Sequence, residues 1–230
     1  MATTKSQRWG ILAILIVTVI GTIGSFAVII LSTQNQAKDT AAQQKAYAEY
    51  KQKSDEYEKK VAAQADALSA QYYDTFKPYE DRVAAFDLAG VSTLTSEDLA
   101  VGEGEEITGT TPFAAYYIGW NPKGKVFDGS IDAEKSKLKA PLFTAVSLEK
   151  GLDNAMLVQG WKDGMKGMRL GGIREINIPS DLAYGEQGRG DDIPANTPIK
   201  FVVMIIPAPE IFEQPEIPAE LYQSLGNLGA

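Results

Sequence analysis

The chain has 230 residues and a formal net charge of −8, and it contains neither cysteine nor histidine. These absences exclude disulfide bonds, cysteine nucleophiles, histidine general bases and zinc sites built from Cys and His, so no metal site and no cofactor are predicted. Most of the acid excess lies in the second half of the chain, whereas phosphate binding needs clustered Lys and Arg. Nucleic acid is therefore not expected as a partner.

An apolar segment without a single charge lies near the N-terminus, at residues 9–31. A helix of about 20 such residues crosses a bilayer. Lys5 and Arg8 precede the segment, and the charges just after it nearly cancel, so the positive-inside rule keeps the N-terminus cytoplasmic. A cleaved signal peptide is the alternative, but its apolar region is only about 7–15 residues long. We predict that residues 1–31 form a short cytoplasmic tail and a single-pass signal anchor in the cell membrane, with the rest of the chain extracytoplasmic.

A long polar segment follows, rich in Ala, Gln, Lys and Glu over residues 38–77 and free of Gly and Pro until Pro78. This composition is typical of a long helix. An apolar heptad seam along it is interrupted by polar residues, which favours a solvated spacer over a coiled coil. We interpret residues 32–86 as a helical spacer. A weak homodimer through this helix, and a holdase role for it, are the alternatives.

The next part of the chain is expected to be irregular before strands begin. Residues 86–104 are acidic and end in a turn-prone run. Alternation of apolar residues predicts a strand at 113–119. The sequence Asn-Pro-Lys-Gly at 121–124 is typical of a tight turn, after which the strand pattern resumes at 126–128.

An amphipathic helix is predicted from Gly160, because Trp161, Met165 and Met168 share one helical face. The glycine pair at 171–172 should end this helix. Beyond it we expect a strand at 173–178, a Gly-rich loop at 184–192 and a strand at 199–206. Reactive groups are scarce in this stretch and apolar ones abundant, which is typical of an apolar pocket with a few polar groups.

Five segments of the second half carry a family pattern. They are AYYIGW at 115–120, GKVFDGS at 124–130, LVQGWKDGMKGM at 157–168, INIPSDLAYG at 176–185 and IPANTPIKFVVMII at 193–206. In order and spacing they resemble the FKBP-type peptidyl-prolyl cis-trans isomerases, and the whole chain resembles a membrane-anchored bacterial member of that family.

The resemblance implies an α+β fold, in which a twisted antiparallel β-sheet wraps around one short α-helix. Here that fold would follow an N-terminal transmembrane helix and the long helical spacer. The isomerase domain is predicted at 87–210, and residues 211–230 form a Pro-containing C-terminal tail.

The resemblance also implies the residues of the site. The catalytic pocket would contain Tyr117, Phe127, Asp128, Trp161, Tyr184 and Phe201. The substrate-binding positions would be Leu157, Val158, Ala183 and Ile193. A further pocket position falls on Phe143 or Val146. Taken alone, such aromatic residues are usually core residues, and an Asp at position 128 could simply bond to a nearby turn. The glycine-rich loop is the family's flap over the pocket, and it carries Arg189 where the best-known members have His.

The function expected from these residues is isomerisation of Xaa-Pro bonds in exported or cell-envelope proteins. The partners would be Xaa-Pro segments of polypeptides, the lipid bilayer through residues 9–31, and FK506-type inhibitors in the same pocket. An apolar site needs no covalent step here, because it only has to fit the twisted amide better than either planar isomer. The alternative is a non-catalytic FKBP-like binding module or a holdase chaperone that recognises Pro-containing segments.

Overall fold

The computed structural model describes residues 37–219 and residue 221, and the chain divides into two compact units. One unit is Ala63–Glu210, which we call the sheet unit, and the other combines Met1–Ala62 with Ile211–Ala230. The predicted membrane span at 9–31 lies outside the described residues. Among the residues that are described, no helix is both long enough and apolar enough to cross a bilayer. The predicted domain boundaries at residues 31, 86 and 210 stay predictions.

Two α-helices are described, and the first confirms the predicted long helix. Helix α2 (Ala37–Phe76) runs through the Gly- and Pro-free segment and gives way to a 3-10 helix at Lys77–Arg82 that contains Pro78. Helix α3 (Gln159–Met165) is the short helix of the sheet unit. Further 3-10 helices lie at Leu88–Gly90, Thr144–Val146, Leu148–Lys150, Leu152–Asn154, Ser180–Leu182 and Gly185–Gln187.

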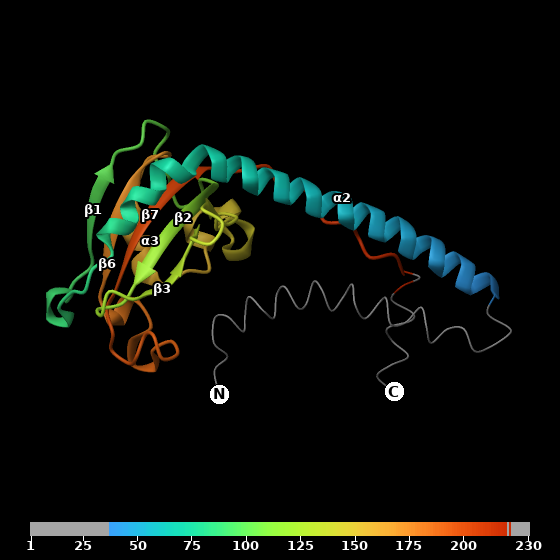
Figure 1. Ribbon diagram of the computed structural model, residues 1–230. Coiled ribbons are helices and arrows are strands. Elements are labelled where there is room, and N and C mark those ends of the chain that lie inside the picture. Colours follow the sequence, from blue (N-terminus) through green and yellow to red (C-terminus); the bar gives the residue numbers. More distant parts are fainter. Residues whose placement is uncertain (1–36, 220, 222–230) are drawn as a thin grey trace. The chain divides into compact units, whose positions relative to one another are not determined.

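A five-stranded antiparallel sheet forms the centre of the sheet unit, in the order β1-β6-β7-β2-β3 (Figure 1). Its strands are β1 (Thr95–Ala100), β2 (Phe113–Trp120), β3 (Val126–Gly129), β6 (Ile173–Ile178) and β7 (Ile199–Pro207). A separate hairpin pairs β4 (Ile131–Asp132) with β5 (Lys137–Leu138). The four strands predicted from the sequence, at 113–119, 126–128, 173–178 and 199–206, are all present, and the α+β class is confirmed.

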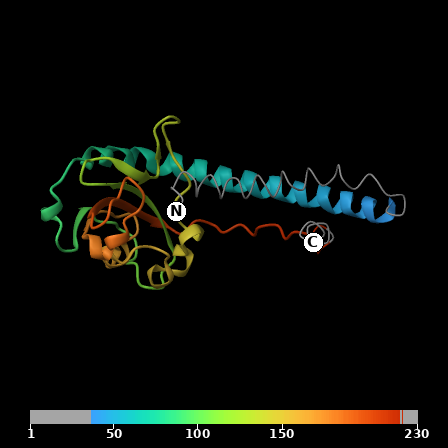
Figure 2. The ribbon, with the colours of Figure 1, turned by 90° about the horizontal axis from the view of Figure 1, so that it is seen from below.

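Both faces of this sheet are covered, which explains why all eight residues of β2 are buried. Successive side chains of a strand point to opposite faces. Tyr117 therefore faces α3, where its ring centroid lies 5.4 Å from that of Trp161. Tyr116 faces the end of α2, with ring centroids 6.2 Å from Tyr72 and 6.4 Å from Phe76. Figures 1 and 2 show these last turns of α2 running along the sheet.

Strand β1 corrects the prediction that residues 86–104 are irregular. Its sequence, TSEDLA, is polar and mostly exposed, so it has no apolar alternation to reveal it. Pairing with β6 creates the strand: the Arg174 guanidinium donates to both Asp98 carboxylate oxygens at 2.6 and 3.0 Å, and the Asn177 amide donates to the Thr95 hydroxyl at 3.0 Å. An edge strand of this kind is specified by its partner rather than by its own sequence.

The end of α3 also differs from the prediction. The helix stops at Met165 rather than at the glycine pair 171–172, because Lys166 is extended and Gly167 adopts a φ of 74°. That left-handed conformation suits glycine. Trp161, Met165 and Met168 are nevertheless all buried, so the predicted apolar face is correct although its last residue lies in the turn.

The segment after α2 is held against the sheet by charged and polar contacts. Arg82 donates to the buried carboxylate of Glu175 on β6 at 2.8 Å and to Glu97 on β1 at 3.1 Å. The Lys200 ammonium lies 3.7 Å from the same Glu175 carboxylate. A buried carboxylate is costly unless it is paired, and this one has two cationic partners. Arg82 thus connects the chain leaving α2 to strands β1 and β6, and Lys200 on β7 supplies the second cation.

Candidate functional site

Four aromatic rings meet on the face of the sheet that carries α3. The Phe201 ring lies 5.1 Å from Trp161, 5.6 Å from Phe127 and 6.2 Å from Tyr117, measured between centroids. Edge-to-face geometry prevails, with interplanar angles of 73° and 88° for the first two pairs. The structure therefore brings together, from β2, β3, α3 and β7, four residues that are far apart in the sequence.

Gly119 leaves space for the rings of Phe201 and Phe127, because it has no side chain. The family pattern does not assign this role. A Cβ atom added there would lie 2.3 Å from the Phe201 ring and 3.0 Å from the Phe127 ring. Any side chain at this position would push the two rings apart. The register of β2 between β7 and β3 sets Gly119 beside both Phe201 and Asp128. Only this register shows why the position requires glycine.

A hydrogen-bonded pair lies at the edge of the aromatic cluster. The Tyr117 hydroxyl donates to Asp128 Oδ2 at 2.6 Å, and the Gly129 N–H donates to Asp128 Oδ1 at 3.0 Å. Ser130 fixes the backbone of this tyrosine, since its hydroxyl accepts from the Tyr117 N–H at 3.0 Å. The predicted contact between Tyr117 and Asp128 is confirmed. Ser130, which fixes the tyrosine, is the last residue of the segment GKVFDGS, and the family pattern assigns it no role.

Burial, reinforced by the negative charge of Asp128 and the hydrogen bond to it, raises the pKa of Tyr117 well above its ordinary value. The folded protein thus retains the Tyr117 proton, whereas the unfolded chain loses it near pH ~10. Below that pH the stabilisation from this group is complete. Above it the free energy of unfolding falls as pH rises, because the unfolded state binds fewer protons than the native state.

We expect the variant Tyr117→Phe to weaken this alkaline dependence. Urea unfolding at a series of pH values between about 10 and 12 should give a shallower decrease in unfolding free energy for the variant than for the parent chain. Tyr116 and Tyr72, whose pKa values burial also raises, are unchanged in both proteins and serve as an internal reference. Equal slopes would contradict the assignment to Tyr117.

The predicted substrate-binding residues belong to, or pack against, the hydrophobic core that contains the aromatic cluster. Leu157, Val158 and Ala183 are partly buried and pack against the core, whereas Ile193 is fully buried, with 1% of its surface exposed. Val158 immediately precedes α3, and its backbone N–H donates to no other group in the described part of the chain. A free donor beside apolar walls fits the expected contact with a substrate carbonyl, which stays a prediction.

Hydrogen bonds anchor the flap, residues 184–192, near both of its ends. The Asn196 N–H donates to the Gly185 carbonyl at 2.8 Å, and the Asn121 amide donates to the Asp192 carbonyl at 2.9 Å. Within the flap the Arg189 guanidinium donates to the Tyr184 hydroxyl and lies 5.2 Å from the centre of that ring. Tyr184, expected to donate to substrate, therefore accepts a hydrogen bond from its own loop and keeps its proton for another partner.

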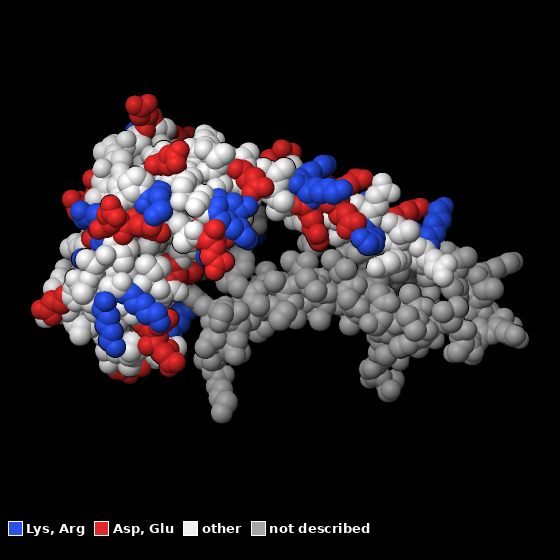
Figure 3. Space-filling view, viewed as in Figure 1, with Lys and Arg blue, Asp and Glu red and all other residues white. Residues whose placement is uncertain are grey.

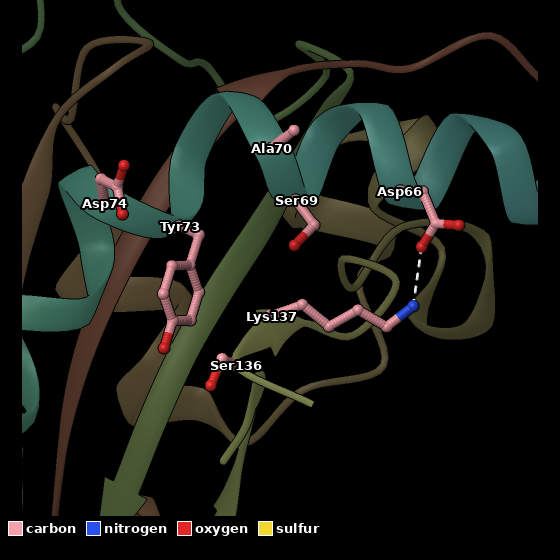
Figure 4. A pocket seen from close by; sticks show the side chains of 7 residues that line it. All are labelled: Asp66, Ser69, Ala70, Tyr73, Asp74, Ser136 and Lys137. Carbon is pink, nitrogen blue, oxygen red and sulfur yellow. Dashed lines mark hydrogen bonds and ion pairs between the residues drawn. The ribbon is translucent and has the colours of Figure 1, made fainter. Parts of the chain in front are cut away.

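A surface groove elsewhere in the sheet unit contains none of the predicted site residues. It is lined by Asp66, Ser69, Ala70, Tyr73, Asp74, Ser136 and Lys137 (Figure 4). Its polar groups join α2 to the β4–β5 hairpin: the Lys137 ammonium lies 2.7 Å from the Asp66 carboxylate, and the buried Ser69 hydroxyl accepts from the Leu138 N–H at 2.8 Å. These contacts give the groove a structural role, and the aromatic cluster remains the candidate site.

Comparison with known proteins finds a family match over the part of the chain that contains the aromatic cluster. The model of the FKBP-type peptidyl-prolyl cis-trans isomerase family matches residues 104–206. An FK506-binding protein of Neisseria meningitidis serogroup A is 33% identical over 116 residues, which cover 50% of this chain and 96% of the relative. A probable FKBP-type peptidyl-prolyl cis-trans isomerase of Haemophilus influenzae is 32% identical over 107 residues, covering 46% of this chain and 39% of that protein.

Two solved structures are also similar. The crystal structure of AtFKBP13 has 29% sequence identity and a TM-score of 0.42, with 50% of this chain and 93% of that chain covered. A peptidyl-prolyl cis-trans isomerase from Pseudomonas syringae pv. tomato has 27% identity and a TM-score of 0.40, with coverage of 64% and 93%.

Proposed function

Because this chain belongs to the FKBP-type peptidyl-prolyl cis-trans isomerases, we propose that its aromatic pocket isomerises Xaa-Pro bonds of exported or cell-envelope proteins while residues 9–31 tether it to the membrane. The enzyme class is that of the family. The observation that carries the proposal is the cluster of Tyr117, Phe127, Trp161 and Phe201, edged by the hydrogen-bonded Asp128.

Such a site suits a reaction in which no covalent bond is broken. Amide resonance gives the peptide bond a rotation barrier of about 18–20 kcal/mol, so that uncatalysed Xaa-Pro exchange takes tens to hundreds of seconds. Twisting the amide removes its charge separation. Transfer of the amide from water to aromatic walls therefore stabilises the twisted transition state relative to both planar isomers.

The polar groups at the edge of the cluster would orient the substrate. The Val158 N–H has no acceptor among the described residues, and the Tyr184 hydroxyl keeps a proton that it can donate. Fixed donors stabilise a particular bound geometry without having to reorganise during the reaction. Asp128, held by Tyr117 and Gly129, places a carboxylate beside the same apolar walls.

The tether rests on the uncharged segment 9–31 and on the positive residues that precede it. In cells producing the full chain, isomerase activity toward an Xaa-Pro peptide should stay with the membrane fraction after high-salt washing. It should be sensitive to an FK506-type inhibitor and to protease added outside intact spheroplasts. A variant lacking residues 9–31 should release the activity into the soluble fraction.

The possible results separate the two parts of this proposal. Soluble activity from the full chain would contradict the tether and leave the enzyme assignment intact. Binding of the peptide without acceleration would instead support a non-catalytic binding module. The hydrogen bond from Arg189 to Tyr184 favours this binding-module alternative. It already engages the oxygen of the hydroxyl that is expected to bind the substrate.

A further inference from the structure

Arg189 places a positive charge in the flap, next to Tyr184. Its guanidinium donates to the Tyr184 hydroxyl and lies over the Tyr184 ring, 5.2 Å from the centroid. The charge is close enough to Tyr117 to act on the titration of that hydroxyl, so Arg189, Tyr184 and Tyr117 share one small region. The guanidinium is thus held against Tyr184, one of the predicted site residues.

The backbone of the flap holds Arg189 in this place. Its N–H donates to the Ile193 carbonyl at 2.6 Å, and the two residues form an isolated antiparallel bridge. Gly188, just before it, has a φ of 60°, and a Cβ atom added there would lie 2.5 Å from the Ile193 carbonyl oxygen. The turn therefore needs glycine at 188, and it fixes the position of the Arg189 backbone.

The guanidinium retains donors for a ligand. It has five N–H groups, and one of them donates to Tyr184. Within the described residues Arg189 forms no ion pair with any carboxylate. Asp192, its neighbour in the flap, is paired with Lys125 at 2.5 Å, while Asp128 accepts from Tyr117 and from the Gly129 N–H. The half-buried Arg189 thus has no carboxylate within ion-pair distance in the described part of the chain.

Figure 3 shows Lys and Arg interspersed with Asp and Glu on the visible face of the sheet unit, without a broad patch of one sign. Dissolved salt screens exposed charges that are separated by more than a Debye length of about 8–10 Å. The charge of Arg189 therefore acts most strongly on ligand groups that bind within this distance of it.

We propose that Arg189 is a specificity-determining residue, which favours substrates with a carboxylate side chain on the residue preceding the proline. The planar guanidinium fork suits bidentate pairing with a carboxylate, and its remaining N–H groups supply the donors. Glu-Pro segments would then be preferred to Lys-Pro segments, whose ammonium would be repelled. This inference rests on the proposed isomerase function and adds a substrate class to it.

The test compares three peptides that differ only in the residue before proline: Glu, Gln or Lys. The full chain in detergent is assayed for kcat/KM with each peptide, and the ratio of Glu-Pro to Lys-Pro is the readout. We expect Arg189→Gln to lower this ratio about fivefold, and Arg189→Glu to lower it further. Arg189→Lys should retain part of the preference. Because each ratio comes from one preparation, a general loss of activity or of folded protein cancels.

Arg169→Gln is the matched control, since it removes the same charge from an exposed residue of the turn before β6. This control should keep the parent ratio, and added salt should reduce the ratio of the parent chain but not that of Arg189→Gln. Acceleration of all three peptides with the same ratio in the parent and in Arg189→Gln would overturn the selectivity alone. Failure to accelerate any of them would overturn the isomerase function as well.

Discussion

Replacing Phe201 with alanine is expected to lower kcat/KM for Xaa-Pro isomerisation by roughly tenfold to a hundredfold. Phe201 is the centre of the aromatic cluster, because its ring contacts those of Trp161, Phe127 and Tyr117. Its removal would take away one apolar wall and admit water to the place where the amide must twist. A protease-coupled peptide assay at saturating protease measures the effect.

The matched control for this substitution is Val202→Ala. Val202 is fully buried on the same strand, but alternation directs it to the opposite face of the sheet, away from the rings. Both variants should lose stability, and the activity assay is run where urea unfolding shows each to be folded. A loss of activity in Val202→Ala as large as in Phe201→Ala would show that the effect reflects stability rather than the pocket.

Replacing Phe76 with alanine is expected to lower the free energy of unfolding of the sheet unit by about 3–5 kcal/mol. Phe76 ends α2, has no exposed surface and packs between Tyr116 on β2 and Tyr79, with ring centroids 6.4 and 6.5 Å away. Domains of this size are stable by only about 5–15 kcal/mol, so the loss is a large share of the total. Urea unfolding followed by circular dichroism would measure it.

Thr75→Ala gives the comparison on the same turn of α2. Thr75 is exposed, and such substitutions usually change stability by less than about 0.5 kcal/mol. If Phe76→Ala were equally mild, the end of α2 would be a detachable spacer. The expected large effect would show that the helix contributes to the core of the sheet unit, so that a fragment starting at residue 87 lacks part of its core.

The local pattern of the sequence predicted those elements whose signal lies within their own residues. Strands β2, β3, β6 and β7 show apolar alternation or β-branched runs, and α2 lacks Gly and Pro from its start to its end. Strand β1 has no such signal because its residues are polar, and its pairing with β6, including that of Asp98 with Arg174, defines it. The end of α3 was misplaced because Gly167 turns the chain before the more conspicuous glycine pair.

The sequence by itself determined the absence of Cys and His, the apolar segment at 9–31, and the family pattern that named the pocket residues. Those features need only residue types and spacing. Tertiary structure alone decided that Gly119 leaves room for two rings, that the last turns of α2 cover Tyr116, and that Arg189 reaches Tyr184. The physical reason is that each of these contacts joins residues brought together by strand register or a loop turn, and neither partner carries a local signal of the other.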